Sequence, residues 1–249
     1  MNKKIRQLAK IINDSERIVF FGGAGVSTAS GIPDFRSSDG IFSQKLRAHL
    51  TPEQLVSHTF YVHYPEEFFD FYKHHLIYPD AKPNDCHLAL AKLEEMGKIR
   101  AVVTQNIDGL HQAAGSRRVY ELHGSVHRNY CTECGRFYPA EKVYQAEGVP
   151  HCDICGEIIK PDVVLYEEGL NQETLSGAVN AIIAADTLII GGTSLVVYPA
   201  AGLIDYFQGK SLVLINKTMT SADSRADLVI NDDIAKVMRE CMTALEQLP

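Results

Sequence analysis

Four cysteines in two short pairs are the strongest chemical signal in the sequence. Two residues separate Cys131 from Cys134 and Cys152 from Cys155, and residues 135–151 lie between the pairs. Two such turns can direct four thiolates at one ion, and this spacing is typical of a zinc site. Because four sulfur ligands leave no position for water or substrate, the zinc would stabilise the fold, and catalysis must reside elsewhere.

Two other interpretations of these cysteines stay open. A Cys-x-x-Cys pair also occurs in thiol oxidoreductases, so the thiols could form a redox centre, although two pairs at this spacing fit zinc better. A zinc ribbon could also be a non-catalytic module that binds nucleic acid or a partner protein. The few basic residues in 125–160 argue against this alternative, which would also leave the polar groups described next unexplained.

A glycine-rich turn is the first candidate for ligand binding. The run Gly22–Thr28 follows the short β-type run 17–21, and such a turn at the end of a parallel strand offers free N–H groups to a pyrophosphate. A nucleotide is therefore the expected ligand. As a dehydrogenase fingerprint the run is weak, because Thr28 replaces the third glycine of G-x-G-x-x-G and no second βα unit supplies an acidic residue for the ribose.

Three more hydrophobic runs end in small or polar groups, which are Gln105–Gly109, Gly191–Ser194 and Asn216. Each of them alone is compatible with an ordinary turn or cap, but together they favour one nucleotide lying across the edge of a sheet. His123 follows the short β-type run 119–122. An imidazole with a pKa near neutrality suits proton transfer, so His123 is the best placed histidine for a catalytic role.

These candidates need a scaffold in which the ends of several strands meet. Hydrophobic β-type runs occur at residues 17–21, 99–104, 187–190, 211–215 and 227–230. They alternate with helical patterns, which predicts an α/β fold with a doubly wound parallel sheet. The predicted helices are 5–12, one that begins at Asn84 and stops before Gly97, Asn171–Ala185 and Asn231–Leu248, with asparagine caps at 84, 171 and 231.

Two stretches interrupt this alternation and are interpreted as insertions. Residues 37–80 look helical and aromatic, and residues 125–160 carry the cysteine pairs. In the first stretch, Thr51–Gln54 fits a capping box. An aromatic stripe of this kind usually forms core, which is the expected role of Phe68, Phe69, Phe71 and Tyr72.

Composition bounds the class of protein. With 249 residues, 45% of them apolar, the chain can bury a substantial core. No apolar stretch predicts secretion or membrane spanning, so a reducing, cytoplasmic location is expected, in which Cys86 and Cys241 stay buried thiols. A formal charge of −7 without a lysine or arginine run argues against direct binding of nucleic acid. The sequence does not specify the oligomeric state.

The order of these motifs resembles that of the sirtuins, which are NAD-dependent protein-lysine deacylases. The matching motifs span essentially the full chain and are Gly23–Arg36, Thr104–His111, His123-Gly124, the two cysteine pairs, Gly192–Ser194 and Ile215-Asn216. The resemblance implies a single sirtuin catalytic unit in two parts. A Rossmann-like NAD-binding domain would comprise 1–36, 81–124 and 161–249, and a small domain would combine the helical insertion 37–80 with a four-cysteine zinc ribbon at 125–160.

The resemblance also implies roles for individual residues. NAD would contact Ala24, Thr28, Phe35, Arg36, Gln105, Ile107, Asp108, His123, Thr193, Ser194, Asn216 and Ile234, with Phe35, Ile107 and Asp108 around the nicotinamide. The acyl oxygen of the modified lysine would attack C1′ of the ribose, expel nicotinamide and leave an alkylimidate. His123 would then act as general base on the ribose hydroxyls, while the Val164 backbone holds the acyl-lysine amide.

The implied substrates are NAD and acetyl-lysine proteins or peptides, with one structural zinc per chain. The products would be free lysine, nicotinamide and 2′-O-acyl-ADP-ribose. Because such an enzyme must present the ribose to a nucleophile, the absence of a dehydrogenase-type ribose acid agrees with this reaction. A mono-ADP-ribosyltransferase or NAD glycohydrolase on the same fold stays the alternative.

Two departures concern the substrate channel. Tyr166 and Glu167 replace the phenylalanine and glycine of the family pattern Val-x-Phe-Gly-Glu, which makes the contacts of Glu167 uncertain. Sirtuins that prefer succinyl or malonyl groups carry a tyrosine followed three residues later by arginine, and here Tyr72 is followed by His75. A neutral histidine lacks the forked charge of arginine, so short or apolar acyl groups are expected, acetyl foremost.

Overall fold

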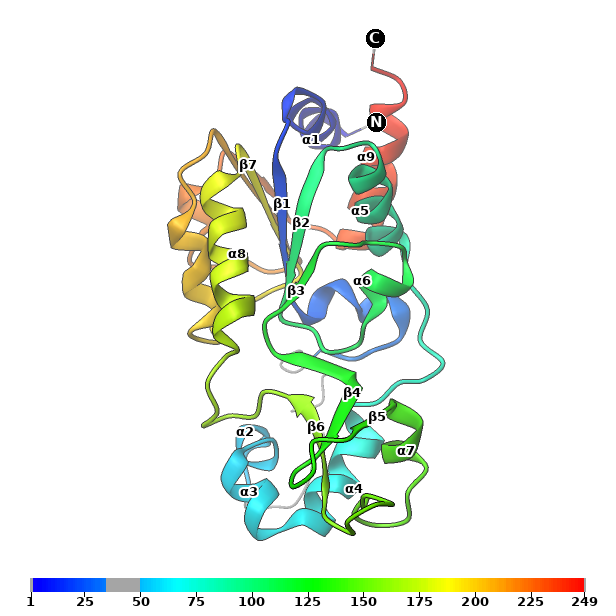
Figure 1. Cartoon of the computed structure of the whole chain (residues 1–249). Coiled ribbons are helices and arrows are strands. Elements are labelled where there is room, and N and C mark those ends of the chain that lie inside the picture. Colours follow the sequence, from blue (N-terminus) through cyan, green and yellow to red (C-terminus); the bar gives the residue numbers. More distant parts are fainter. Residues whose placement is uncertain (1, 35–49, 249) are drawn as a thin grey trace.

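The computed structural model describes residues 2–34 and 50–248, which form two lobes (Figure 1). The large lobe is built on a parallel sheet, and both chain termini lie at its far end. The small lobe combines three helices with a short antiparallel sheet and a further helix. The fold class predicted from the sequence is confirmed, whereas the exact residue boundaries of the two predicted domains stay a prediction.

The parallel sheet has the strand order β3-β2-β1-β7-β8-β9 within the described part of the chain. Its strands are β1 (Ile18–Gly22), β2 (Ile99–Thr104), β3 (Val119–Glu121), β7 (Thr187–Gly191), β8 (Ser211–Ile215) and β9 (Leu228–Ile230). All five predicted strands and the short run at 119–122 are present, with ends shifted by at most one residue. The order reverses between β1 and β7, which is where doubly wound folds bind nucleotides.

Helices cover both faces of this sheet. One face packs against α1 (Lys3–Asp14), α5 (Asp85–Glu95) and α9 (Ile234–Leu245). The other face packs against α8 (Gln172–Ala184) and the 3-10 helix η4 (Ala200–Tyr206). Because side chains alternate along a strand, Ile18 and Phe20 enter the first core, and Val19 and Phe21 enter the second. The doubly wound arrangement is therefore confirmed.

Two of the three predicted asparagine N-caps are confirmed. Asn84 and Asn171 cap α5 and α8 as expected, with their side chains accepting backbone N–H groups of the first turn. The cap predicted at Asn231 is wrong. The last helix begins at Ile234, and its cap is Asp233, whose carboxylate accepts from the N–H groups of Ala235 and Lys236.

The small lobe is held by aromatic packing next to the cysteine pairs. Its elements are α2 (Pro52–Leu55), α3 (His58–His63), α4 (Pro65–His75), β4 (Gly124–Cys131), β5 (Phe137–Tyr138), α7 (Ala140–Tyr144) and β6 (Ile159–Val163). The aromatic stripe of α4 is buried, as predicted, and it packs in one core with residues of β4 and β6. Thr51 and Gln54 form the expected capping box at the start of α2.

Four short elements complete the described part of the large lobe, and the first two contribute residues to the cleft described below. They are η1 (Ala24–Val26), η2 (Thr28–Ser30), α6 (Leu110–Ala113) and η5 (Asp223–Arg225). Within the described ranges, none of the helices combines the length and the apolar character needed to span a bilayer. Cys86 and Cys241 are buried, and burial raises the pKa of the Cys241 thiol to about 12, which agrees with the expected role as inert core thiols.

Candidate active site and metal centre

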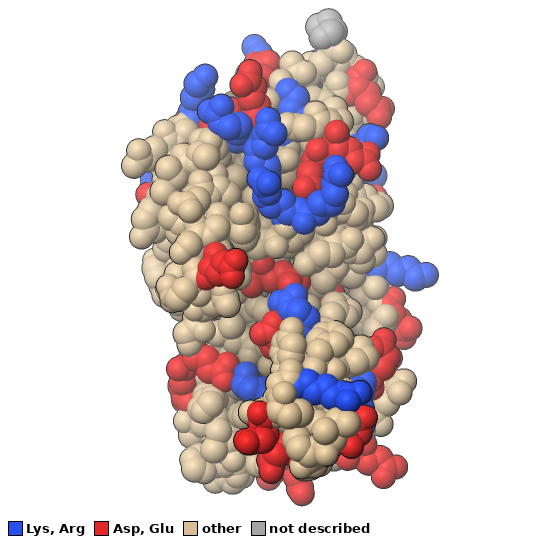
Figure 2. Space-filling view, in the orientation of Figure 1, with Lys and Arg blue, Asp and Glu red and all other residues tan. Residues whose placement is uncertain are grey.

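A cleft of about 670 Å³ lies between the lobes. Its walls combine the ends of β1, β2, β7 and β8 with the segment after β6 and the end of α4. In the space-filling view the molecule narrows at this level, and acidic and basic side chains are mixed over the face that is drawn (Figure 2). The volume falls within the range of small-molecule sites, and the position matches the strand-order reversal.

Two glycine turns meet at the base of the cleft. The Gly25 N–H donates to the Gly192 carbonyl oxygen at 2.8 Å, and a Cβ on Gly25 would lie 2.8 Å from the Gly192 Cα. Only glycine allows this approach between the ends of β1 and β7. The Thr28 hydroxyl donates to the Gly25 carbonyl oxygen at 3.1 Å and closes the turn. The glycine-rich run and Thr28 therefore stand where the sequence places a nucleotide.

Asp108 is fixed by groups from two loops. Its Oδ2 accepts from the Ser27 hydroxyl at 2.7 Å, and its Oδ1 accepts from the Leu110 N–H at 2.9 Å. The Asn106 amide donates in turn to the Ser27 hydroxyl oxygen at 3.0 Å. His127 Nε2 donates to the Asp108 carbonyl oxygen at 3.0 Å. This network orients polar groups from β1 and β2 toward one side of the cleft.

His123 sits at the end of β3, where the chain passes into the small lobe. Its Nδ1 lies 2.9 Å from the Gln105 carbonyl oxygen, which can only accept, so Nδ1 carries the proton and Nε2 is the proton acceptor. Burial lowers the pKa of His123, and the hydrogen bond to Gln105 offsets part of this effect. The imidazole is therefore neutral near pH 7 and ready to act as a base.

A second network joins the ends of β2, β7 and β8. The Gln105 side-chain amide donates to the Thr193 hydroxyl at 3.2 Å, and the Thr193 N–H donates to the Asn216 Oδ1 at 3.0 Å. Ile234 packs over Gly191, where an added Cβ would lie 2.1 Å from the isoleucine Cδ1. Polar groups from three strand ends thus adjoin an apolar side chain, as one elongated nucleotide requires.

The predicted binding residues gather in one place. Ala24, Thr28, Gln105, Ile107, Asp108, His123, Val164, Thr193, Ser194, Asn216 and Ile234 all line the cleft. Phe35 and Arg36 lie outside the described residues. The structure thus brings together every described member of the set, although their individual roles toward NAD and substrate stay a prediction.

The segment after β6 connects His123 to the helical insertion. The Val164 N–H donates to the His123 carbonyl oxygen at 3.0 Å. Two residues further on, Tyr166 bonds Val56 and His58 through its backbone N–H and carbonyl groups, each at 3.0 Å. Glu167 has a φ of 77°, which explains why a glycine suits this position in the family pattern. Its carboxylate contacts Thr59.

Tyr72 and His75 stand where some sirtuins carry a tyrosine and an arginine, and the structure shows how the two side chains lie. Tyr72 is fully buried, stacks on Phe68 and does not line the cleft. His75 does line it. Burial and the neighbouring His74 lower the pKa of His75, and Asp70 offsets part of this, so the imidazole is neutral at pH 7. Neither side chain offers a positive charge to the cleft.

A pair of buried histidines lies behind Asp108. The rings of His87 and His111 meet edge to face with centroids 4.7 Å apart. Burial lowers the pKa of His87 to about 4, against an opposing effect of Asp108, and burial together with His87 lowers the pKa of His111 to about 3. Both rings are therefore neutral at physiological pH. Neither histidine was predicted as a site residue, although His111 ends the motif Thr104–His111.

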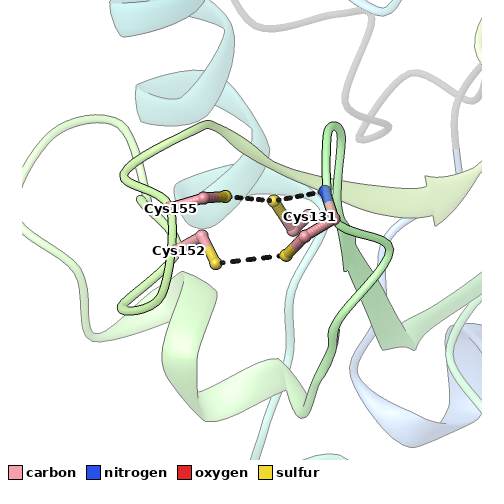
Figure 3. Close-up of side chains that lie close together, drawn as sticks. Cys131, Cys152 and Cys155 are labelled. Carbon is pink, nitrogen blue, oxygen red and sulfur yellow. Dashed lines mark hydrogen bonds between the residues drawn. The ribbon is translucent and has the colours of Figure 1, made fainter.

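The four paired cysteines converge at one end of the small lobe (Figure 3). Their sulfur atoms all lie within 4.8 Å of one another, compared with about 3.8 Å between ligands in a zinc tetrahedron with bonds of about 2.3 Å. The Cys131 and Cys155 sulfurs are 3.3 Å apart, and those of Cys134 and Cys152 are 3.7 Å apart. The donor set and its geometry fit zinc, with all four positions filled by sulfur.

Both cysteine turns have the same construction. Gly135 and Gly156 follow the second cysteine of each pair, have positive φ, and donate an N–H to the carbonyl oxygen of the first cysteine at 3.1 and 3.0 Å. The Tyr138 hydroxyl adds a hydrogen bond to the Cys152 sulfur at 3.1 Å. The repeated pattern Cys-x-x-Cys-Gly was a signal in the sequence that could have identified both glycines.

Three other residues of the cleft were not predicted from the sequence. Ser27, Asn106 and His127 line the cleft and bind Asp108 directly or through one another. Ser27 and Asn106 stand inside the two motifs that were recognised, so their polar side chains were the available signal. For His127, the outward position on β4 gave no such indication.

Comparison with known proteins places the chain in a family. The Sir2 family pattern matches residues 23–199. An NAD-dependent protein deacetylase of Clostridium perfringens (strain 13 / Type A) is 67% identical over 239 residues, which cover 96% of this chain and 98% of that protein.

Solved structures give the same assignment. One is a Sir2 variant with a deacetylated p53 peptide and 3′-O-acetyl ADP ribose; it has a TM-score of 0.88 and 40% identity, and the match covers 96% of this chain and 97% of that one. Another is a Sir2 protein bound to a propionylated peptide; it has a TM-score of 0.84 and 41% identity over 96% and 98% of the two chains. Family pattern, sequence identity and fold agree, and the chain belongs to the Sir2 family.

Proposed function

We propose that this protein is an NAD-dependent deacetylase of lysine side chains in proteins or peptides. The observation that supports this most is the position of His123, whose Nε2 is the proton acceptor at the point where the strand ends of the large lobe meet the segment after β6. The name of the Clostridium perfringens relative, and the peptides in the titles of the similar solved structures, agree with this activity.

The chain supplies binding groups on both sides of the base. Bound NAD would supply a nicotinamide leaving group and a ribose that becomes electrophilic as this group departs. The glycine turns at Gly25 and Gly192 allow close approach of a pyrophosphate, and the Asp108 network would hold the nicotinamide side. The Val164 N–H already donates to the His123 carbonyl oxygen. The Val164 carbonyl is therefore the backbone group that would accept the N–H of the acyl-lysine.

The proposed role of His123 defines the proton transfer and the acetyl transfer of the reaction. With its Nδ1–H fixed on Gln105, Nε2 would accept the proton of a ribose hydroxyl, which then takes the acetyl group. One water, one NAD and one acetyl-lysine would give lysine, nicotinamide and 2′-O-acetyl-ADP-ribose. The four cysteines would hold one structural zinc, which takes no part in these steps.

Mass spectrometry of an acetyl-lysine peptide incubated with NAD tests this function. We expect loss of the acetyl group and formation of O-acetyl-ADP-ribose, with a rate that falls by about 100-fold or more in His123→Ala. His74→Ala is the matched control, because His74 is exposed on α4 and lies outside the cleft. A peptide that gains ADP-ribose, or nicotinamide release with an unchanged peptide, would instead support ADP-ribosyl transfer or NAD hydrolysis.

The acyl range is the second part of the proposal. A dicarboxylic acyl group would find a neutral His75 and no tyrosine hydroxyl from Tyr72 in the cleft, so its distal carboxylate would be poorly bound. We expect acetyl peptides to react faster than matched succinyl peptides at about pH 7.5, where His75 is neutral. Faster removal of succinyl would contradict this preference and leave the deacylase activity itself intact.

A further inference from the structure

The segment after β6 contains a residue in an unfavourable backbone conformation. Glu167 has a φ of 77°, and Leu195, at 55°, is the other non-glycine residue with positive φ in residues 2–34 and 50–248. Glu167 lines the cleft, and Leu195 follows Ser194, which also lines it. A side chain with a Cβ stays in such a conformation only where its surroundings hold it, and such residues are enriched at ligand clamps.

The contact that holds Glu167 comes from the small lobe. One oxygen of its carboxylate accepts from the Thr59 N–H at 2.8 Å and from the Thr59 hydroxyl at 2.7 Å. These bonds to the Thr59 side chain and backbone lower the pKa of Glu167, so the carboxylate is ionised at neutral pH. An ionised acceptor makes stronger hydrogen bonds than a neutral one, which favours both contacts although the two residues are exposed.

Neighbouring contacts continue this attachment along the segment. The Tyr166 N–H donates to the Val56 carbonyl oxygen, and the His58 N–H donates to the Tyr166 carbonyl oxygen, each at 3.0 Å. Glu168 lies 2.9 Å from His58 Nδ1 and accepts from the Leu165 N–H at 2.9 Å. The segment 164–168 is thus attached to His123 at its beginning and to α3 at its end.

We infer that Glu167 is a positioning residue, whose carboxylate, held by Thr59, fixes segment 164–168 against α3 and thereby sets the affinity for the acyl-lysine peptide. The inference rests on the proposed function, since that function makes this segment the peptide-binding edge. Without the carboxylate, nothing from Thr59 would oppose relaxation of residue 167 to negative φ, which would turn the backbone beside Val164. The reacting atoms and the NAD side of the cleft would stay in place.

Variants at two positions separate the carboxylate from the backbone strain. Glu167→Gly removes both the hydrogen bonds and the Cβ, whereas Glu167→Ala removes the bonds and keeps the Cβ at positive φ. We expect the KM for an acetyl peptide to rise about three- to tenfold in Glu167→Gly, as for loss of one or two exposed hydrogen bonds. Glu167→Ala should show at least the same rise and a lower Tm than Glu167→Gly.

Conservative variants and a distant control define the specificity of the effect. Glu167→Gln keeps an acceptor oxygen and should recover part of the peptide affinity, and Thr59→Ser keeps both donors and should match the wild type. Thr59→Val loses the hydroxyl donor and should raise the peptide KM. The control Glu147→Ala removes an exposed carboxylate elsewhere in the small lobe and should change nothing. In all variants, kcat and the KM for NAD should stay within about twofold.

Amide hydrogen exchange at Thr59 gives a readout that does not depend on activity. Its N–H donates to Glu167, so Glu167→Gly should accelerate its exchange, and Glu147→Ala should not. Unchanged exchange, or faster exchange with an unchanged peptide KM, would overturn the inference. If the wild-type protein fails to deacetylate, the proposed function falls. In that case, fluorescence anisotropy measures the affinity for the acetyl peptide and tests the inference. Equal affinities of the wild type and Glu167→Gly would overturn it.

Discussion

The two lobes reach a stable structure by different means. In the large lobe, β1 and β7 are buried along their whole length, and two apolar cores flank the sheet. In the small lobe, β5 has one exposed and one buried residue, and large apolar side chains near the cysteines stay exposed, such as Phe137 at 52% and Ile154 at 64%. The cysteine pairs thus lie at the edge of the small-lobe core, with Cys131 and Cys152 buried and Cys134 and Cys155 exposed.

Each lobe needs a different kind of stabilisation. A sheet with helices on both faces buries enough carbon to fix its strand ends, and these ends line one side of the cleft. The turns that carry the cysteines lie at the edge of the small-lobe core, so four thiolates on a metal would hold them where packing is incomplete. We therefore expect the small-lobe side of the cleft to depend on a bound metal, and the side formed by the parallel sheet to be independent of it.

Removal of a zinc ligand should have the largest effect and tests this division directly. We expect Cys131→Ser to lose bound zinc, to reduce deacetylation by about 100-fold or more, and to expose the amides of β4 and β6 to fast exchange. Amides of β1 and β7 should stay protected. The control Cys241→Ala, in the core of the large lobe, should lower Tm and keep one zinc per chain. Persistent protection of β4 and β6 without zinc would refute the division.

Substitution of Gly124 should have the next largest effect, because the small sheet has no room at this point. Gly124 has a φ of 76°, and an added Cβ would lie 1.9 Å from the Asp162 carbonyl oxygen. We expect Gly124→Ala to lower the free energy of unfolding by about 3 kcal/mol or more. Gly148→Ala is the matched control, since Gly148 has a φ of 65° with open space around it, and it should cost only about 1–2 kcal/mol. Equal losses in urea unfolding would show that close approach is not decisive.

Acid should weaken the large lobe through its buried histidines. The folded-state pKa values of His87 and His111, about 4 and about 3, lie below the unfolded value of about 6.5, so the unfolded chain binds more protons between these limits. Stability should fall as the pH decreases below about 6.5, by up to about 1.4 kcal/mol per pH unit for each histidine. Exchange of β1 amides between about pH 7 and about pH 5 measures this slope.

Variants identify the source of this pH dependence. His111→Leu should reduce the slope, because one of the two groups no longer titrates, and His74→Ala, on an exposed site of α4, should leave it unchanged. If the wild type and His111→Leu show the same slope in the β1 amides, other groups are responsible for the acid sensitivity of the large lobe.

The smallest effect should come from a surface ion pair of the large lobe. Arg239 and Asp85 join α9 to α5 at 2.9 Å, with both side chains largely exposed. We expect Arg239→Ala to cost less than about 1 kcal/mol in denaturant unfolding. Leu90→Ala, fully buried in α5, should cost about 2–5 kcal/mol. A larger loss for Arg239→Ala than for Leu90→Ala would contradict the view that carbon packing holds this lobe.

Much of the fold could be predicted because its signals are local. Buried strands such as β1 and β8 contain continuous hydrophobic runs, and the cysteine spacing indicates the metal site. The predicted start of the last helix was wrong because Asn231, Asp232 and Asp233 are all good N-caps, and only the packing of α9 selects the third.

The residues of the site were predictable to the extent that topology places them. Polar groups after parallel strands meet at one sheet edge, which is why Gln105, Thr193 and Asn216 were expected to lie close together, as they do. The contact between Thr59 and Glu167 joins residues 108 positions apart and requires an unusual φ, so no local pattern announces it. Tertiary approach, and not propensity, determines such contacts.

The bond between the Val164 N–H and the His123 carbonyl has a consequence for motion. Here the chain passes between the lobes twice, side by side, since Gly124 also pairs with Val163. Any rotation of one lobe against the other that keeps these bonds must pivot close to residues 123 and 164. The separation of the imidazole from the backbone beside it would then change least, and distances across the far rim most. Under the proposed function, such a rotation would widen the cleft for exchange of the dinucleotide while the distance between His123 and residue 164 stays constant.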